Sequence, residues 1–338
     1  MRPQDTEVRR GAPRRRGRYT GGVNSKDRSL DVGAAQAGSR LDVFLAEKLA
    51  LSRAQARRLL ARGAVRIGTR VLSERAKGER VQPGTKVDVA HFARPENQRA
   101  LPQPEATLTV LARGEGWLAI DKSAGTPVHP LDPDETGTVL NALIARQPEV
   151  HGVGEGGLRS GVVHRLDVDT TGALLFATDE AAWQLLRAAF REHRVTKTYR
   201  ALVTGRLEGD GEIELAFVTA RHRPAKVRVL ADAELARSRG ARDGQLRWRC
   251  LERFEGATLV EVQPRTGHLH QIRATFAYLG HPVAGDRGYG SSEDTTGAPR
   301  QMLHASEVAV GEVAASSPDP EDFRRLCEEL RGAGPAPR

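Results

Sequence analysis

Residues 161–179 combine an acidic side chain with surroundings that suit acid–base or nucleophilic chemistry. Asp167 stands in a polar cluster that begins at His164, and apolar runs of strand length lie on both sides of it. Gly172 allows a sharp bend, and Asp179 can cap a following helix. Catalytic groups are common on loops that rigid elements hold in place. The segment therefore predicts Asp167 as a catalytic carboxylate, with a simple turn cap as the alternative.

Two later segments supply side chains that could assist such a carboxylate. Residues 197–203 alternate like a strand, so Lys197 and Tyr199 share one face. An aromatic ring on that face can stack on a nucleic-acid base, although a strand tyrosine can equally belong to the core. Arg273 lies beside the apolar stripe of a predicted helix, near its start, where the helix dipole does not favour a cation. We therefore expect either a specific carboxylate partner or a surface position for Arg273.

Metal chemistry has little support in the sequence. His268 and His270 are two residues apart, which places them on different sides of a helix and argues against a metal pair. Asp167 and Asp169 could hold Mg²⁺ in a phosphodiester-cleaving site, and this nuclease is the main rival chemistry. No further carboxylate cluster accompanies them, so we predict neither a metal nor a cofactor.

The bulk properties favour a polyanionic partner. The chain has 338 residues, of which 52 are Lys or Arg and 43 are Asp or Glu, giving a formal charge of +9. Nucleic acid is the leading candidate for the partner. The two cysteines, Cys250 and Cys327, are far apart and support neither a disulfide framework nor a zinc site. No apolar run is long enough to span a membrane. We expect a cytoplasmic protein, and a monomer.

Changes in composition divide the chain into five parts. Residues 1–30, with six arginines between Arg9 and Arg18, predict a disordered basic arm. Residues 31–90 predict two short helices and a few small strands, residues 91–105 a proline-containing linker, and residues 106–312 a larger domain. Residues 313–338 are interpreted as a C-terminal tail. Short apolar runs alternate with helices in the larger domain, which indicates an α+β fold with a central sheet.

The two short helices of the N-terminal part carry the strongest charge signal. Ser39 with Asp42, and Ser52 with Gln55, have the spacing of helix capping boxes. Between Ala50 and Ser73 there are six arginines and no acidic residue. Like charges four apart on a helix repel one another, and RNA phosphates would relieve that repulsion. We predict RNA contacts there by Arg53, Arg57, Arg58 and Arg62. This part resembles the α-L RNA-binding module of a ribosomal small-subunit protein and of many RNA-modifying enzymes.

Residues 161–179, 197–205 and 264–290 resemble, in order and spacing, the motifs of the RluA-type pseudouridine synthases. Residues 117–130 are similar to the opening motif of that family. The resemblance implies a mixed, largely antiparallel central sheet with flanking helices and an active-site cleft, beside a small N-terminal α/β RNA-binding domain. It also implies an isomerase that flips a uridine out of structured RNA and converts it to pseudouridine without a cofactor.

The resemblance assigns roles to several residues. Asp167 matches the catalytic aspartate, Tyr199 the active-site tyrosine and Arg273 the basic partner of the aspartate. Arg165 matches the arginine that helps to fill the gap left by the flipped base. We also predict contacts with the substrate RNA by His164, Thr170, Lys197, His270 and Gln271.

The chain departs from the family pattern at three positions. His268 and Leu269 replace the usual Arg-Thr pair before His270, and Thr171 replaces a serine. On family analogy we expect large-subunit ribosomal RNA as the substrate. The alternatives are a transfer-RNA pseudouridine synthase and a non-catalytic RNA-binding or ribosome-assembly factor.

Overall fold

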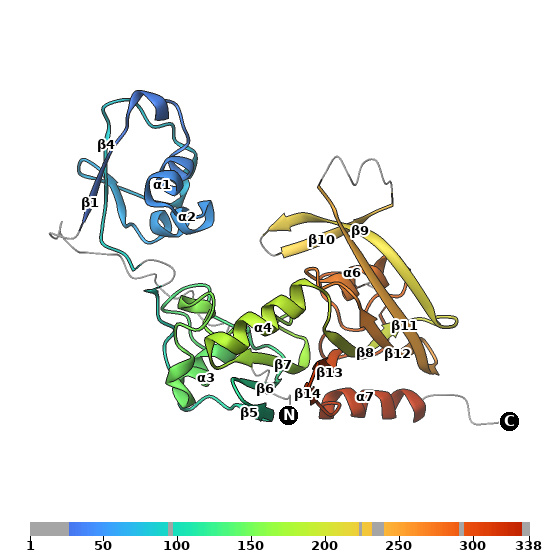
Figure 1. Ribbon diagram of the computed structural model, residues 1–338. Helices are drawn as coiled ribbons and strands as arrows, with labels where there is room; N and C mark the ends of the chain where they lie inside the picture. Colours follow the sequence, from blue (N-terminus) through green and yellow to red (C-terminus); the bar gives the residue numbers. More distant parts are fainter. Residues whose placement is uncertain (1–26, 94–96, 223–224, 232–239, 291–293, 333–338) are drawn as a thin grey trace, which may run out of the picture. The chain divides into compact units, whose positions relative to one another are not determined.

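The computed structural model describes residues 27–93, 97–222, 225–231, 240–290 and 294–332 (Figure 1). The chain forms two compact units, residues 1–93 and 94–338. Each unit has a sheet and a hydrophobic core of its own.

The N-terminal unit is a four-stranded sheet with two short helices. Its elements are β1 (Arg28–Asp31), α1 (Leu41–Leu49), α2 (Arg53–Ala61), β2 (Val65–Ile67), β3 (Arg70–Leu72) and β4 (Lys86–Val89). The strand order is β1-β4-β2-β3, with every pairing antiparallel. Phe44, Leu45 and Leu60 are fully buried between the helices and the sheet. Burial of these apolar side chains stabilises a unit that is otherwise rich in arginine.

Two expectations for this unit need correction. Residues 1–26 of the predicted disordered arm lie outside the described residues, but β1 shows that the last residues of that arm belong to the sheet, because β4 supplies their backbone partners. Ser39 does not cap α1, whose N-cap residue is Arg40 without a side-chain cap bond. The second capping box, formed by Ser52 and Gln55, is confirmed.

The C-terminal unit is built on a ten-stranded sheet with the order β10-β9-β11-β12-β8-β13-β7-β6-β5, in which β14 pairs with β13. Its strands are β5 (Thr109–Gly114), β6 (Trp117–Lys122), β7 (Thr171–Ala177), β8 (Thr196–Thr204), β9 (Gly211–His222), β10 (Ala225–Leu230), β11 (Arg242–Phe254), β12 (Ala257–Pro264), β13 (Leu303–Val310) and β14 (Val313–Ser316). Among the pairings described, β13 with β7 is parallel and the others are antiparallel.

Helices cover both faces of this sheet. They are α3 (Val139–Arg146), α4 (Glu180–Arg191), α6 (Gln271–Tyr278) and α7 (Glu321–Gly332). Successive residues of a strand point to opposite faces, so α3 packs on the face of β7 that carries Leu174, and α4 packs on the face that carries Leu175. In the same way α6 covers the face of β8 that carries Val203, and α7 covers the face that carries Leu202 (Figure 1). The predicted α+β class with a mixed, largely antiparallel sheet is confirmed.

The predicted linker and tail are more structured than expected. Ala100 is buried in the core beside α3, and Gln103 bonds to the backbone of the α3 residue Asn141, so the second part of the predicted linker packs on the larger unit. Residues 313–332 of the predicted tail include β14 and α7. The helix α7 is held because Phe323 and Leu326 pack against Leu202 of β8 and Leu259 of β12. Residues 333–338 lie outside the described residues. No helix in the described part of the chain is long and apolar enough to cross a lipid bilayer.

Candidate active site

Asp167 lies on the loop that enters β7, at the point where β7 meets β13. The backbone N–H of Thr170 donates to the Asp167 carbonyl oxygen at 3.1 Å, which closes a tight turn. Gly172 follows with a φ of +109°, and a Cβ at this position would collide with the carbonyl oxygen of Ala305 on β13. A glycine is therefore required for the two strands to approach each other, and their junction fixes the place of the Asp167 loop.

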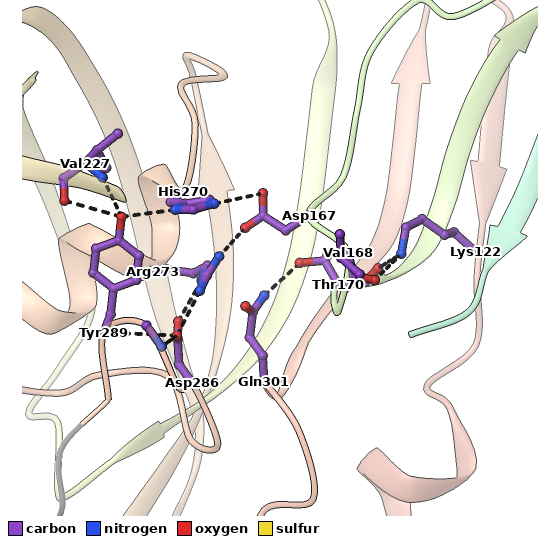
Figure 2. A network of polar contacts seen from close by, with 11 residues as sticks. Lys122, Asp167, Val168, Thr170, Val227, His270, Arg273, Asp286, Tyr289 and Gln301 are labelled. Atoms are coloured by element: carbon purple, nitrogen blue, oxygen red, sulfur yellow. Dashed lines mark hydrogen bonds and ion pairs between the residues drawn. The ribbon is translucent and has the colours of Figure 1, made fainter. Parts of the chain in front are cut away.

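Arg273, on the first turn of α6, joins two carboxylates (Figure 2). Its Nη1 donates to Asp167 Oδ2 at 2.9 Å. Its Nε and Nη2 donate to the two carboxylate oxygens of Asp286 at 2.6 and 2.8 Å. The Asp286 side chain is fully buried, whereas that of Asp167 is 22% exposed. The bidentate pair with Asp286 orients the guanidinium, so one N–H points at the carboxylate that solvent can reach.

The protonation states within this trio follow from burial and pairing. Burial opposes charge on Arg273, but its hydrogen bonds to Asp286 and the charge of Asp167 raise its pKa above the ordinary value. Burial likewise favours a protonated Asp286, but the Arg273 hydrogen bonds hold the pKa of Asp286 below its usual range. The guanidinium is thus a permanent cation beside Asp167.

His270 and Tyr289 lie beside Arg273, on the same side of Asp167 (Figure 2). His270 Nε2 is 3.9 Å from Asp167 Oδ1, and its Nδ1 is 3.1 Å from the Tyr289 hydroxyl. Burial lowers the pKa of His270, although the Asp167 charge acts in the opposite direction. The ring of Tyr289 lies between Lys226 Nζ and the Arg273 guanidinium, at 5.1 and 5.0 Å from the ring centre. Tyr289 therefore contacts both side chains that pair with Asp167, through its ring to Arg273 and through its hydroxyl to His270.

Tyr199 is half-buried on β8, on the face that α6 covers. Burial, and then the negative charge of Asp167, raise the pKa of its hydroxyl. Lys197, two residues earlier on the same face, donates from Nζ to the Thr266 carbonyl oxygen at 2.8 Å. Burial lowers the pKa of Lys197 to about 8. Arg165 is exposed two residues before Asp167. Four of the predicted residues interact with the Asp167 carboxylate, namely Arg165, Tyr199, His270 and Arg273.

His164 has structural partners inside the protein. Its Nε2 accepts a hydrogen bond from the backbone N–H of Leu175 at 2.9 Å, and its ring stacks on Phe190 of α4 at 4.5 Å between centroids. Burial, together with the charges of Lys197 and Arg187, lowers its pKa to about 3. A neutral ring with this bond and this stack joins β7 to α4, and the contact of His164 with RNA stays a prediction.

Thr170 and Gln271 are also used inside the protein. Thr170 is buried, and its Oγ1 accepts from Gln301 Nε2 at 2.8 Å. Gln271 is buried as well, and its Oε1 accepts from Thr266 Oγ1 and from the backbone N–H of His268. These two side chains shape the loops around the site, which corrects their prediction as RNA contacts. The partner of Thr170 is 131 residues away, so spacing could not indicate it, whereas the partners of Gln271 are local and had been overlooked.

The residues that depart from the family pattern take different positions. His268 Nε2 lies 2.8 Å from the carbonyl oxygen of Asp243 on β11, so its ring ties the start of α6 to a neighbouring strand. Leu269 is an exposed large apolar side chain.

Several residues at the site had not been singled out from the sequence. Lys122 is only 1% exposed, and its Nζ donates to the carbonyl oxygens of Ser123, Val168 and Thr170 at 2.9, 2.7 and 2.8 Å. A lysine at the end of an apolar strand could have indicated a structural role, because a buried ammonium group needs hydrogen-bond partners. Asp286 and Tyr289 lay within a glycine-rich run whose fold cannot be derived from residue spacing.

The arrangement around Asp167 does not resemble a magnesium site. Asp167 Oδ2 is already bonded to a guanidinium, and Asp169 is exposed on the far side of the turn. Within the described ranges there is no group of three or more His, Cys, Asp or Glu side chains placed to hold a metal ion. The geometry therefore offers a carboxylate beside a fixed cation and a protonated tyrosine, which suits nucleophilic or acid–base chemistry on a bound ring.

In the N-terminal unit the predicted RNA-binding arginines have an acidic partner that the sequence did not suggest. Asp42, on α1, is fully buried, and its Oδ2 accepts from Arg57 Nε at 2.7 Å. Arg53 lies 3.5 Å from the same oxygen with a side chain 55% exposed, and Arg40 also bonds to Asp42. Burial opposes the ionised form, but the hydrogen bonds from Arg40 and Arg57 lower the pKa of Asp42 to about 2. The charge of Asp42 therefore relieves part of the repulsion between arginines that the sequence analysis attributed to RNA phosphates.

Comparison with known proteins gives concordant results. Residues 116–278 match the family model described as RNA pseudouridylate synthase, and residues 39–77 match that of the S4 domain. An uncharacterised RNA pseudouridine synthase of Mycobacterium bovis is 33% identical over 320 residues, which cover 91% of this chain and 99% of that protein. Ribosomal large subunit pseudouridine synthase D of Vibrio parahaemolyticus is 30% identical over 320 residues, covering 88% and 92%. The solved structure of human RNA pseudouridylate synthase domain containing 1 is 26% identical with a TM-score of 0.51, covering 69% of this chain and 97% of that one.

Proposed function

The chain belongs to the RNA pseudouridine synthases and is an isomerase, and from that premise we propose that it modifies uridine in large-subunit ribosomal RNA with Asp167 as its catalytic carboxylate. The observation that supports the catalytic role best is the hydrogen bond from Arg273 to Asp167, backed by the buried Asp286. The relatives named for the ribosomal large subunit support the choice of RNA.

The reaction breaks the bond between the ribose C1′ and N1 of the uracil, turns the ring, and joins C1′ to C5. The proton on C5 is released and N1 gains one, so atoms and charge balance without an oxidant. Asp167, paired with Arg273, serves as nucleophile or general base at this step. Tyr199 keeps its proton near pH 7 and stacks on the detached ring.

Two groups of cations hold the substrate in this proposal. Arg165, exposed beside the carboxylate, occupies the gap that the flipped uridine leaves. Base flipping costs a few kcal/mol, and phosphate contacts by the S4 arginines offset that cost. We further propose that the protein acts as a monomer in the cytoplasm, which light scattering of the purified chain and fractionation of cells would test.

The test is tritium release from RNA labelled at uridine C5, with large-subunit ribosomal RNA, small-subunit ribosomal RNA and transfer RNA as separate substrates. We expect the wild-type protein to release tritium from the large-subunit RNA. Asp167→Asn should reduce the rate by about a thousandfold or more, because the reaction loses its carboxylate. Asp169→Asn is the matched control, since it removes an exposed carboxylate two residues away, and it should stay within about twofold of wild type.

Other results would change the proposal in distinct ways. Release from transfer RNA alone would move the substrate to that class. Binding without release from any RNA would favour a non-catalytic RNA-binding factor. RNA cleavage without tritium release, lost in Asp169→Asn and stopped by a chelator, would favour the magnesium nuclease.

A further inference from the structure

Two basic side chains from distant parts of the chain, Lys122 and Arg300, donate hydrogen bonds to the backbone of the loop that carries Asp167. The carbonyl oxygens of Val168 and Thr170 accept from Lys122 Nζ at 2.7 and 2.8 Å (Figure 2). The carbonyl oxygen between them, that of Asp169, accepts from Arg300 Nη1 at 3.3 Å. Three successive carbonyl groups of the loop thus accept from basic side chains. Burial lowers the pKa of Lys122 to about 7, so Arg300 is the permanent cation of the two, and hydrogen bonds from ionised donors are stronger than those between neutral groups.

Arg300 is itself oriented by the C-terminal helix. Its Nε and Nη2 donate to the two carboxylate oxygens of Asp322, on the first turn of α7, at 2.6 and 2.9 Å. The Arg300 side chain is only 11% exposed. Because the guanidinium is planar, a bidentate bond on one edge determines where Nη1 points. That group then reaches both the Asp169 carbonyl oxygen and, at 2.8 Å, that of Gln301.

The next residue strengthens the same connection. Gln301 is buried, and its Nε2 donates to Thr170 Oγ1 at 2.8 Å. Thr170 in turn donates its backbone N–H to Asp167. Side chains from residues 300 and 301 therefore contact the loop on both sides of its turn, and α7 anchors the first of them through an ion pair.

We propose that Arg300 and Asp322 are positioning residues for Asp167, so that α7 takes part in the reaction by fixing the catalytic loop. The inference rests on the role proposed above for Asp167. Neither residue touches the reacting atoms. A loop that moves by about 1 Å can lose a hundredfold in rate while substrate binding elsewhere is unaffected. Weakening the pair should therefore lower kcat and leave KM for RNA nearly unchanged.

Asp322→Asn tests the inference, because it keeps the shape of the side chain and removes the charge that orients Arg300. We expect kcat to fall by about tenfold or more with KM within about twofold of wild type. Asp322→Glu, which restores the carboxylate, should recover most of the rate. Backbone amide exchange at residues 166–171 should also become faster in Asp322→Asn, since the loop loses a brace.

The matched control is Asp319→Asn. Asp319 lies just before α7 and pairs with Arg200 of β8, so its loss weakens the docking of the same helix without touching the loop. It should keep kcat within about twofold of wild type even if unfolding occurs at a lower temperature. Should Asp322→Asn fail to fold, Arg300→Lys provides the second test, because an ammonium cannot hold Asp322 in a bidentate bond and bond to both carbonyl groups.

The outcomes separate this inference from the proposed function. If wild type is active, Asp167→Asn is inactive and Asp322→Asn turns over like wild type, the positioning role is wrong and the proposed function stands. If Asp319→Asn loses as much kcat as Asp322→Asn, the effect belongs to helix docking in general and the inference is overturned. If Asp167→Asn is active, the proposed function itself fails.

Discussion

At the scale of single residues, the site depends on polar groups whose partners come from far along the chain. Arg273 illustrates what a sequence can predict, because a cation at the start of a helix, beside an apolar stripe, needs a carboxylate and has one in Asp167. The second carboxylate, Asp286, was not predictable in this way. It lies 13 residues after Arg273 in a loop, and only the fold brings it back to the guanidinium.

His164 shows the opposite case, a polar residue predicted to contact substrate whose ring also has structural partners inside the protein. Its position next to Arg165 and Asp167 gave it the character of a site residue. Whether a loop histidine faces solvent or a buried N–H depends on the neighbouring strand, and here Leu175 on β7 supplies that N–H. The spacing of residues contains no information on this choice, because both positions use the same loop conformation.

The state of His164 leads to a prediction on stability. Its pKa is lowered to about 3 in the folded protein by burial and by Lys197 and Arg187, whereas an unfolded histidine titrates near 6.5. Between these two values the unfolded chain binds more protons, so this contribution to stability is complete above pH 6.5. It falls by about 1.4 kcal/mol for each pH unit below that value.

His164→Gln should remove this dependence, since the glutamine oxygen can accept from Leu175 and does not titrate. The measurement is urea unfolding of both proteins between pH 4.5 and 8. The wild-type free energy of unfolding should drop relative to that of the variant only below pH 6.5, and the other titrating groups cancel in the difference. A difference that is constant across this range would contradict the assignment.

At the scale of elements, the edge strand β10 is joined to the active site through Tyr289. The Tyr289 hydroxyl accepts from the backbone N–H of Val227 at 2.8 Å and lies 3.3 Å from its carbonyl oxygen. Lys226 also donates to the carbonyl oxygen of Gly288. An edge strand has backbone groups that no further strand satisfies, and here a tyrosine beside the catalytic cations provides partners (Figure 2).

Tyr289→Phe should therefore loosen β10 and release His270, while the ring stays between Arg273 and Lys226. We expect faster amide exchange at residues 225–230, because the lost hydrogen bonds lower the free energy of local opening by about 1–2 kcal/mol. We also expect kcat to fall several-fold. Tyr278→Phe is the matched control, because that tyrosine is half exposed at the end of α6 and should change neither quantity. Unchanged exchange in β10 would show that its backbone pairing with β9 suffices.

Most elements with regular patterns were predictable, and those that depend on tertiary partners were not. The apolar runs of β6, β7 and β12 and the stripes of α4 and α6 follow from local spacing. By contrast, β11 carries charged residues along much of its length and is held by pairing with both β9 and β12. The helix α7 does have a local signal that the tail interpretation overlooked, because Phe323, Leu326 and Leu330 have helical spacing and pack against β8 and β12.

At the scale of the whole molecule, the two units divide RNA binding from chemistry in the proposed function. The basic unit contains no counterpart of the Asp167 site among its described residues, and its charge is arranged around the buried Asp42. Arg57 is a structural partner of Asp42, so changing it would confuse RNA contact with folding. Arg53 is the better choice for a test, because its guanidinium lies 3.5 Å from the Asp42 carboxylate, whereas that of Arg57 lies at 2.7 Å.

The double variant Arg53→Gln with Arg58→Gln should weaken RNA binding and lower the slope of log affinity against log salt by about one to two. Turnover at saturating RNA should stay near wild type, since the chemistry lies in the other unit. The control is Arg28→Gln with Lys48→Gln, which removes the same charge from exposed positions of β1 and α1. Equal salt slopes for the two double variants would show that charge alone, and not its place on α2, matters.

The parallel pairing of β13 with β7 also sets an order in time while the protein is being synthesised. Thr171 and His304, whose side chains lie 2.9 Å apart, are separated by 133 residues, which take about 7 to 27 s to synthesise at 5–20 residues per second. During that interval the loop of Asp167 exists without β13 and Arg300, which contact it in the folded protein. A growing chain thus acquires its RNA-binding unit early and its catalytic loop late, so a nascent chain that engages RNA begins to modify it only after His304 has been added.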